Sequence, residues 1–290
     1  MTAVVGAPVR EALDAAVDAL AAAGIEEPRL DAELLLGEAM QMSRAALVAD
    51  PTAEVPPAAG RRFGEMVRRR LRREPVAYIL GRKGFRNLEL AVDQRVLIPR
   101  PETELLVELA LELRPARVLD VGTGSGAIAL AVADELTDAE VTATDTSPPA
   151  LEVARANARR LRLDERVRLV EGTLPDKGTG FDLILANLPY VAERDWRSLQ
   201  PEVTRYEPRE ALLAGPDGLD AYRSFIPECG RALASYGGLT STTLAVEVGE
   251  GQASAVAELM RAAGFGEVET RRDLAGIDRV VVGRSVKVEA

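Results

Sequence analysis

The stretch VLDVGTGSGAIAL, residues 118–130, decides the fold of this chain. A short apolar run ends at Val121, and three glycines follow at alternate positions, Gly122, Gly124 and Gly126. Glycines adopt positive φ easily and let a ligand lie against backbone N–H groups at the start of a helix. The stretch therefore predicts a buried strand, a ligand-binding turn and a helix, which together form one unit of a doubly wound α/β sheet.

Strands and helices continue to alternate after this unit. The expected strands are 117–122, 140–145, 166–172, 181–187, 238–249, 266–270 and 279–284, and the expected helices are 126–136, 148–161, 218–234 and 252–265. Alternation of this kind predicts a mainly parallel sheet with helices on both faces. The last two strands can form an antiparallel hairpin at the edge, and the sequence leaves the strand order open.

The N-terminal part of the chain has apolar residues at helical spacing instead. A stripe that begins at Val9 should end at Gly24, and a second helix should open at Pro28 and stop near Gly37. A third helix carries RRFGEMVRRRLRR, residues 61–73, with seven arginines. Its charged face is either a solvated helix surface or a contact for an acidic or ribosome-bound partner.

Short alternating runs around Gly81 and Gly84 predict a β-hairpin after these helices. The expected organisation is therefore a helical N-terminal domain (1–74), a β-hairpin linker (75–98) and an α/β domain (99–290).

Composition excludes several kinds of chemistry. The chain of 290 residues has no histidine and one cysteine, Cys229, so histidine bases, thiolate metal sites and internal disulfides are excluded, and we expect no metal. No apolar run reaches the roughly 18 residues that a membrane span needs, and the N-terminus lacks a signal-peptide layout, so we expect a cytoplasmic protein. A net charge of −10 disfavours a nucleic-acid partner.

The glycine turn predicts a cofactor site. Asp145 ends the second strand, where its carboxylate can accept hydrogen bonds from both hydroxyls of a ribose. GTGSGA alone also fits a dinucleotide fingerprint, but VLDVGTGSGAIAL with TATDTSPPALEVARANA (142–158) resembles the S-adenosylmethionine site of class I methyltransferases. The resemblance implies that the methionine side is contacted by Gly122, Thr123, Gly124, Ser125 and Gly126, the ribose by Asp145, and the adenine by Thr173 or Leu174. Asp120 would hold the methionine amino group or the loop backbone.

A second motif, Asn187-Leu188-Pro189-Tyr190, ends the fourth strand. It resembles the Asn/Asp-Pro-Pro-aromatic signature of amino-methylating enzymes in this superfamily. The resemblance implies that the Asn187 side-chain oxygen and the Leu188 carbonyl accept the two N–H bonds of the substrate nitrogen, with Tyr190 packed against the substrate or cofactor. Leu188 departs from the amide-methylating pattern, and Asn-Leu-Pro-Tyr is the form found in ribosomal RNA adenine dimethylases.

Longer segments favour one family. Residues 30–47, 75–108, 206–223 and 246–256 are similar to segments of the peptide chain release factor glutamine N5-methyltransferases, and PRPETE (99–104) is the most discriminating. The resemblance implies a seven-stranded Rossmann-like methyltransferase sheet and methyl transfer from S-adenosyl-L-methionine, leaving S-adenosyl-L-homocysteine. The acceptor would be the glutamine of the Gly-Gly-Gln loop in bacterial class-1 release factors.

The same resemblance implies that the helical N-terminal domain recognises the substrate, and it places Arg100, Glu102 and Thr103 close to the substrate. We expect a monomer. Two alternatives stay open: an RNA adenine N6-methyltransferase, and a non-catalytic S-adenosylmethionine-binding module that docks a translation factor. A nicotinamide enzyme is a more distant alternative.

Overall fold

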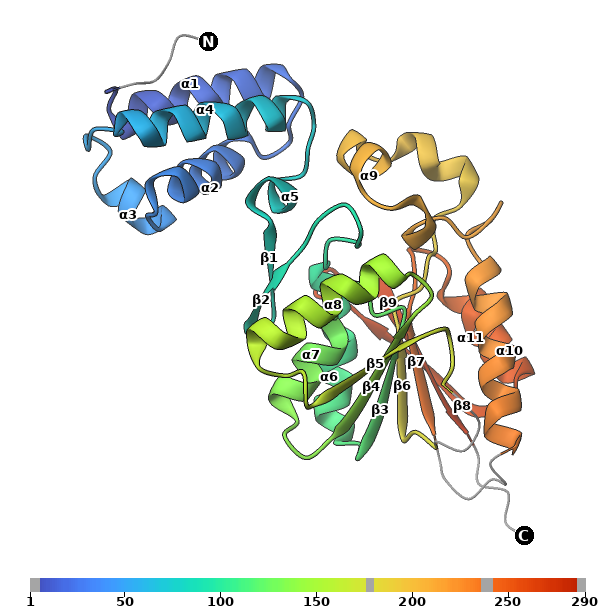
Figure 1. Ribbon diagram of the computed structural model, residues 1–290. Coiled ribbons are helices and arrows are strands. Elements are labelled where there is room, and N and C mark those ends of the chain that lie inside the picture. Colours follow the sequence, from blue (N-terminus) through green and yellow to red (C-terminus); the bar gives the residue numbers. More distant parts are fainter. Residues whose placement is uncertain (1–5, 176–179, 236–241, 286–290) are drawn as a thin grey trace. The chain divides into compact units, whose positions relative to one another are not determined.

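The computed structural model describes residues 6–175, 180–235 and 242–285 (Figure 1). Its α-helices are α1 (Val9–Ala22), α2 (Pro28–Met40), α3 (Arg44–Ala49), α4 (Pro57–Leu71), α5 (Val76–Leu80), α6 (Glu104–Leu113), α7 (Ala127–Glu135), α8 (Pro148–Leu161), α9 (Pro201–Tyr206), α10 (Asp220–Ser235) and α11 (Ala253–Ala262). Its 3-10 helices are η1 (Pro101–Thr103), η2 (Glu193–Ser198) and η3 (Arg209–Ala211). Its strands are β1 (Arg82–Phe85), β2 (Leu88–Ala91), β3 (Arg117–Val121), β4 (Glu140–Asp145), β5 (Val167–Glu171), β6 (Leu183–Ala186), β7 (Thr243–Glu247), β8 (Phe265–Arg272) and β9 (Asp278–Ser285).

The chain forms two compact units. The first holds the described residues up to Arg82 together with Gln200–Tyr206, and the second holds Lys83–Leu199 and the described residues from Glu207 onward. The elements of the first unit are helices, except that its first segment ends at Arg82, where strand β1 begins. The segment that contains α9 thus belongs to the helical unit, although it interrupts the α/β unit in the sequence.

The second unit is built on a seven-stranded sheet with the order β5-β4-β3-β6-β7-β9-β8. The strands from β5 to β7 in this order pair in parallel, whereas β9 pairs antiparallel with both β7 and β8. The predicted mainly parallel, doubly wound sheet is confirmed, and so is the antiparallel hairpin at its edge. The first four residues of the strand expected at 238–249 lie outside the described residues.

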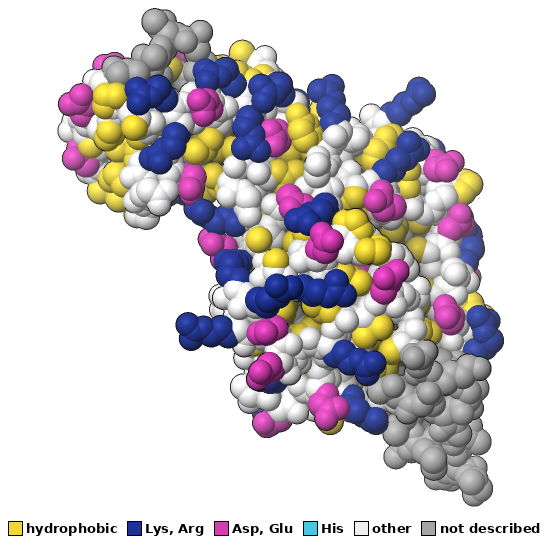
Figure 2. All heavy atoms as spheres, in the orientation of Figure 1, with side chains coloured by type: hydrophobic (Ala, Val, Ile, Leu, Met, Phe, Trp, Pro, Cys, Tyr) yellow, Lys and Arg dark blue, Asp and Glu magenta, His cyan; other side chains and the backbone are white. Residues whose placement is uncertain are grey.

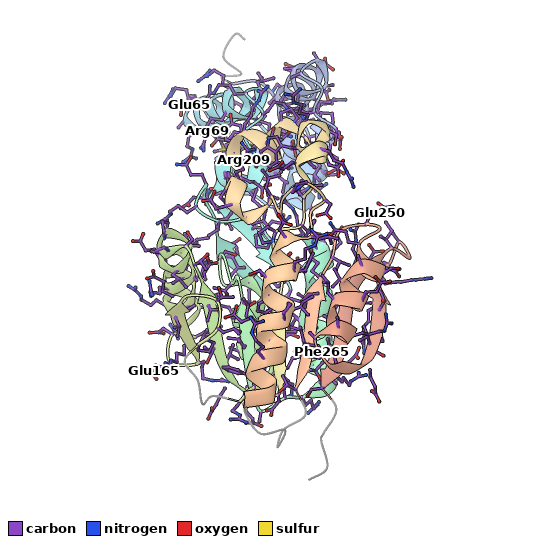
Figure 3. All side chains as sticks on the ribbon, turned by 90° about the vertical axis from the view of Figure 1, so that its right-hand side faces the viewer. Glu65, Arg69, Glu165, Arg209, Glu250 and Phe265 are labelled. Atoms are coloured by element: carbon purple, nitrogen blue, oxygen red, sulfur yellow. The ribbon has the colours of Figure 1, made fainter. Side chains whose placement is uncertain are left out.

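Helices cover both faces of this sheet. Apolar side chains of α6 and α7 form one core cluster with alternate strand residues such as Val118 and Leu185, and Ala158 of α8 joins it. The opposite cluster holds side chains of α10 and α11 with Leu119 and Ile184. Figure 3 shows α10 lying across that second face. Because neighbouring strand residues point to opposite faces, the buried runs read from the sequence are apolar at nearly every position.

Local signals set the boundaries of β4 and α8. Both elements begin and end at the residues predicted from the sequence. Ser147 caps α8 by accepting a hydrogen bond from the backbone N–H of Ala150 at 3.4 Å, and Pro148 occupies the first helical turn. The end of β4 is therefore fixed directly beside a helix N-terminus.

The helical unit differs from its prediction at Gly37. This glycine lies inside α2, which continues to Met40 and ends with Gln41 in the left-handed conformation. A Cβ atom at position 37 would lie 2.8 Å from the backbone oxygen of Met42, so the glycine allows a close approach of the chain rather than a stop. Gly24, at φ 73°, follows the end of α1 as expected.

The arginines of helix α4 and of the two positions after it have two different roles. Arg70, which is 7% exposed, pairs with Asp31 at 2.6 Å and with Glu202 of α9 at 2.7 Å, and Arg73 pairs with Glu202 at 2.6 Å. These arginines hold the helical unit together. The exposed ones are Arg61, Arg62, Arg68 and Arg72. Figure 2 shows dark blue side chains over α4. Because these four arginines are exposed and Arg70 is buried, only part of the arginine run is a solvated face.

The expected hairpin is formed by β1 and β2, but its first residues are helical instead, because Val76–Leu80 forms α5. Its turn is tied to the α/β unit, where Glu104 of α6 accepts a hydrogen bond from the backbone N–H of Arg86 at 3.0 Å. Glu104, in the first turn of α6, therefore anchors this turn.

Within the parts of the chain that the structure describes, no helix combines the length and apolar character required to cross a membrane. The same residues contain no group of three or more His, Cys, Asp or Glu side chains placed to hold a metal ion.

Candidate functional site

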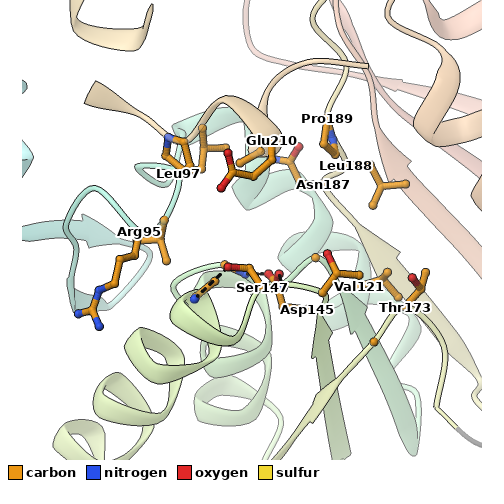
Figure 4. A pocket seen from close by; sticks show the side chains of 18 residues that line it. Arg95, Leu97, Val121, Asp145, Ser147, Thr173, Asn187, Leu188, Pro189 and Glu210 are labelled. Carbon is orange, nitrogen blue, oxygen red and sulfur yellow. Dashed lines mark hydrogen bonds between the residues drawn. The ribbon is translucent and has the colours of Figure 1, made fainter. Parts of the chain in front are cut away.

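A pocket lies at the carboxyl ends of the parallel strands in the α/β unit (Figure 4). The predicted residues that line it are Gly122 and Gly124 after β3, Asp145 at the end of β4, Thr173 after β5, and Asn187, Leu188 and Pro189 after β6. Strand order reverses between β3 and β6, and ligands of open α/β sheets bind at such a switch point. The structure therefore brings the glycine turn and the Asn-Leu-Pro motif into one pocket.

The glycine turn is held against the neighbouring strand. The backbone N–H groups of Gly122 and Thr123 both donate to the carbonyl of Thr144 on β4 at 2.9 Å. Gly122 and Gly124 have φ values of 74° and 56°, which cost other residues about 1 kcal/mol or more. The turn needs glycine at both positions, and its backbone borders the pocket.

Asp145 connects this turn to the next helix. Its Oδ2 accepts a hydrogen bond from the backbone N–H of Gly124 and its Oδ1 accepts one from Ser147, each at 2.9 Å. An ionised carboxylate has about four acceptor positions, so two remain for a ligand. In Figure 4, Asp145 and Ser147 lie on one side of the pocket, and Leu97 and Glu210 lie on the other.

Asp120 is fully buried beneath the turn. Its Oδ2 accepts hydrogen bonds from the Thr123 hydroxyl at 2.6 Å and from the backbone N–H of Ala129 at 3.1 Å. Its Oδ1 has no hydrogen-bond partner among the described residues. Burial raises the pKa of Asp120 to about 7, although the two hydrogen bonds lower it. Asp120 therefore fastens the turn to α7, and it is not among the described residues that line the pocket.

Ser125 and Gly126 support the turn from outside the pocket. The Ser125 carbonyl accepts a hydrogen bond from the side chain of Asn157 at 2.9 Å. Gly126 precedes α7 at φ 86°, and a Cβ atom there would lie 2.8 Å from Leu130 Cδ1. The described residues that line the pocket do not include Thr123, Ser125 or Gly126.

Of the two residues expected near an adenine, only Thr173 lines the pocket. Its carbonyl accepts a hydrogen bond from the Thr144 hydroxyl at 2.8 Å, which links the end of β5 to β4. Leu174 packs against the apolar cluster beneath α10 instead.

The Asn-Leu-Pro-Tyr motif divides between pocket and core. Asn187 donates from Nδ2 to Thr103 Oγ1 at 3.0 Å, which leaves its Oδ1 free to accept elsewhere. The side chain of Leu188 is part of the apolar core, and the residue is 9% exposed. Tyr190 is not among the pocket-lining residues; its carbonyl accepts a hydrogen bond from Gln252 at 2.9 Å, and burial raises its pKa to about 12.

The residues of PRPETE lie behind the pocket. Arg100 forms an ion pair with Glu207, which also accepts a hydrogen bond from the backbone N–H of Ile98 at 3.1 Å. Glu102 is half-buried and raises the pKa of Glu247. Thr103 is buried against Asn187. Arg100, Glu102 and Thr103 are therefore not among the described residues that line the pocket, and Thr103 reaches it through its hydrogen bond with Asn187.

Sequence reasoning missed several residues of the site. Ser147 could have been found, because a serine before two prolines and an apolar helix is an N-cap signal. Glu247 had a signal too, since it is the one acid in the apolar run LAVEV of β7. Leu97 and Glu210 also line the pocket, but they belong to irregular or 3-10 segments that no periodic pattern marks.

Comparison with known proteins gives the family of the chain. Residues 11–81 match the family described as PrmC N-terminal domain, and residues 101–202 match the family described as Methyltransferase small domain. Over 282 residues the chain is 45% identical to the release factor glutamine methyltransferase of Caulobacter vibrioides, covering 94% of this chain and 95% of that protein. The release factor glutamine methyltransferase of Moorella thermoacetica is 45% identical over 278 residues, covering 93% and 96%.

A solved structure shares the fold at low identity. The hMettl16 catalytic domain in complex with the MAT2A 3′UTR hairpin 1 has a TM-score of 0.54 over 72% of this chain and 78% of its own, at 16% identity. This likeness extends to the fold alone. The identity to the curated relatives covers nearly their full length, and on that ground the chain belongs to the release factor glutamine methyltransferase family.

Proposed function

We propose that this protein transfers a methyl group from S-adenosylmethionine to the side-chain amide nitrogen of a glutamine in a peptide chain release factor. The acceptor is the glutamine of the Gly-Gly-Gln loop of a bacterial class-1 factor. One observation carries the proposal: Gly122, Gly124 and Asp145 line the same pocket as Asn187 and Leu188. A cofactor end and an acceptor end therefore meet in one cavity, in a chain that belongs to this family.

The cofactor end fits S-adenosylmethionine in its donor and acceptor groups. Asp145 has acceptor positions left for two ribose hydroxyls, and the glycine turn lets a ligand approach the backbone. Asp120 keeps a buried oxygen without a partner among the described residues, which suits the ammonium group of a methionine moiety. When bound, S-adenosylmethionine supplies an activated sulfonium methyl group.

The acceptor end fits a primary amide. Asn187 Oδ1 and the carbonyl oxygen of Leu188 are both acceptors, and a glutamine side chain offers two N–H bonds on one nitrogen. Two fixed acceptors orient that nitrogen and its lone pair for in-line attack. The amide proton leaves after transfer, so the reaction needs no strong base, and the chain has no histidine to supply one.

A labelling experiment tests this function. Purified protein and methyl-labelled S-adenosylmethionine are incubated with an unmodified release factor, with its loop Gln→Ala variant, and separately with unmodified ribosomal RNA. We expect label on the wild-type factor alone. Label on RNA alone would contradict the proposal and assign the activity expected from the Asn-Leu-Pro-Tyr form of the motif.

The Asn187→Ala variant separates an enzyme from a docking module. Losing one pre-organised acceptor should lower kcat by about 100-fold or more, with S-adenosylmethionine still bound. If the wild-type protein transfers no methyl group, and Asn187→Ala binds the release factor as well as the wild-type protein does, the protein is a non-catalytic module.

A further inference from the structure

The side chain of Asn187 is held from behind by Thr103. Its Nδ2 donates to Thr103 Oγ1 at 3.0 Å, and Thr103 is only 4% exposed. Thr103 occupies the N-cap position of α6, where a threonine oxygen normally accepts a hydrogen bond from the first helical turn. Here its side chain makes no such cap. The hydroxyl is therefore used for the contact with Asn187 rather than for the helix.

Glu247 is the next buried group in this direction. Ala186 pairs with Val246 in the parallel register of β6 and β7, so Asn187 and Glu247 stand next to each other where these strands end. Glu247 is 2% exposed, and its Oε2 has no hydrogen-bond partner among the described residues. A buried carboxylate in an apolar strand costs several kcal/mol unless it is compensated. Such a residue beside the strand end that carries Asn187 calls for a functional reason.

The Thr103 hydroxyl connects the two residues. Hydrogen bonding of the Thr103 side chain to the Glu247 carboxyl lowers the pKa of Glu247 against the larger effect of burial. A hydroxyl has one proton to donate, and an ionised carboxylate can only accept it. Thr103 accepts from Asn187 Nδ2, so its own proton is left for another acceptor, and the nearby buried carboxylate is that of Glu247. With the proton turned toward Glu247, Thr103 can only accept from Asn187. It therefore selects the Nδ2 group and turns Oδ1 of Asn187 away from itself.

We propose that Thr103 is a positioning residue for methyl transfer, and that Glu247 fixes the direction of its hydroxyl. The two residues together choose one of the two orientations of the Asn187 amide. The inference rests on the proposed function, because it assigns Oδ1 of Asn187 to the substrate nitrogen. With the amide reversed, an NH₂ group would face the NH₂ group of the substrate and neither would be satisfied.

Two substitutions at Thr103 test this role. Thr103→Val removes the hydroxyl with little change of shape, and Thr103→Ser keeps it. We expect Thr103→Val to lower kcat with the release factor by about 10-fold to 100-fold, because one buried donor of Asn187 loses its partner. The KM for S-adenosylmethionine should stay unchanged, and Thr103→Ser should keep most of the wild-type kcat.

A double-mutant cycle separates positioning from a general structural effect. In an Asn187→Ala background, Thr103→Val should cost no further activity, since the group that it positions is absent. Full kcat in Thr103→Val, or an equal loss in both backgrounds, would overturn the proposal. Thermal melting of each variant checks that the fold is kept.

Glu247→Gln provides an independent variant if Thr103→Val folds poorly. An amide can either accept from Thr103 or donate to it, so the direction of the hydroxyl is no longer fixed. We expect a several-fold lower kcat, again without a change in the KM for S-adenosylmethionine, and an unchanged kcat would contradict the role of Glu247.

The labelling experiment with the wild-type protein distinguishes a failure of this inference from a failure of the proposed function. If it labels RNA and not the release factor, the function fails, and the same variants are then measured on RNA. Asn187 would hold the amino group of an adenine through the same oxygen, so the expected losses remain and their absence overturns the role of Thr103.

Discussion

Oδ2 of Asp145 accepts a hydrogen bond from the backbone N–H of Gly124 at 2.9 Å, and this contact joins the end of β4 to the glycine turn after β3. The other oxygen of the same carboxylate accepts from the N–H of Ser147. One side chain thus orders both backbone segments on its side of the pocket. The geometry of the cofactor end depends on it even before a ligand binds.

The Asp145→Ala variant should bind S-adenosylmethionine at least about tenfold more weakly, because hydrogen bonds to an ionised group contribute about 1.5–3 kcal/mol each. Isothermal titration of the purified variant measures this. Asp164→Ala is the control, since it removes the same charge from an exposed position outside this pocket. Wild-type affinity in Asp145→Ala would show that the ribose is held by other groups.

Leu188→Pro should be tolerated in catalysis. The acceptor at this position is the backbone carbonyl, which proline keeps, and Pro189 already restricts residue 188 to extended conformations. The cost should fall on stability, by about 1–2 kcal/mol, because the Leu188 side chain is buried in the core. Steady-state kinetics with the release factor and chemical denaturation measure the two effects. A large loss of kcat with intact stability would mean that the leucine side chain takes part in substrate choice.

The sequence predicted the elements whose signals are local. Strand β4 and helix α8 were placed correctly because a short run rich in β-branched residues ends at Asp145 and two prolines open a stretch with helical spacing. The glycine turn and Asn187 lie in one pocket because both directly follow strands, and parallel strands end at the same edge of the sheet.

Contacts between residues that are distant in the chain could not be predicted from the sequence. The pair Thr103 and Asn187 is separated by 84 positions, and Arg73 and Glu202 by 129. Nothing in the local pattern around Glu202 indicates that α9 belongs to the helical unit. The early residues of the expected hairpin fold as α5, since a five-residue apolar run does not by itself distinguish a helix from a strand.

Glu202→Ala should destabilise the helical unit by about 2–4 kcal/mol, because it leaves the buried guanidinium of Arg70 with only part of its compensation. Denaturation in urea measures the change. Glu65→Ala is the matched control: Glu65 is an exposed residue of α4 (Figure 3), and its loss should alter stability by less than about 0.5 kcal/mol. Equal effects of the two substitutions would contradict a structural role for the ion pairs of α9.

The pH dependence of kcat should depend on Glu247. Burial raises its pKa to about 7; Thr103, Arg279 and Arg100 lower it, and Glu102 raises it further. The ionised form fixes the Thr103 hydroxyl, so kcat should fall as the pH falls through about 7 at saturating S-adenosylmethionine. Asp120 also has a pKa of about 7, but it should affect the KM for the cofactor rather than kcat. In Glu247→Gln the acid limb of the kcat profile should disappear.

The same pKa shift has the opposite effect on stability. A glutamate with an unfolded pKa of about 4.3 binds a proton more tightly in the folded protein when its folded pKa is raised, so folding becomes less favourable as the pH rises between these values. At pH 8 Glu247→Gln, which carries no charge, should therefore be more stable than the wild-type protein by about 2–4 kcal/mol, and at pH 5 the difference should shrink to about 1 kcal/mol. Unfolding in urea at the two pH values measures this. A variant that gains stability at pH 8 while it loses kcat would identify Glu247 as a buried charge kept for catalysis; equal stability at both pH values would mean that its charge is compensated in the fold.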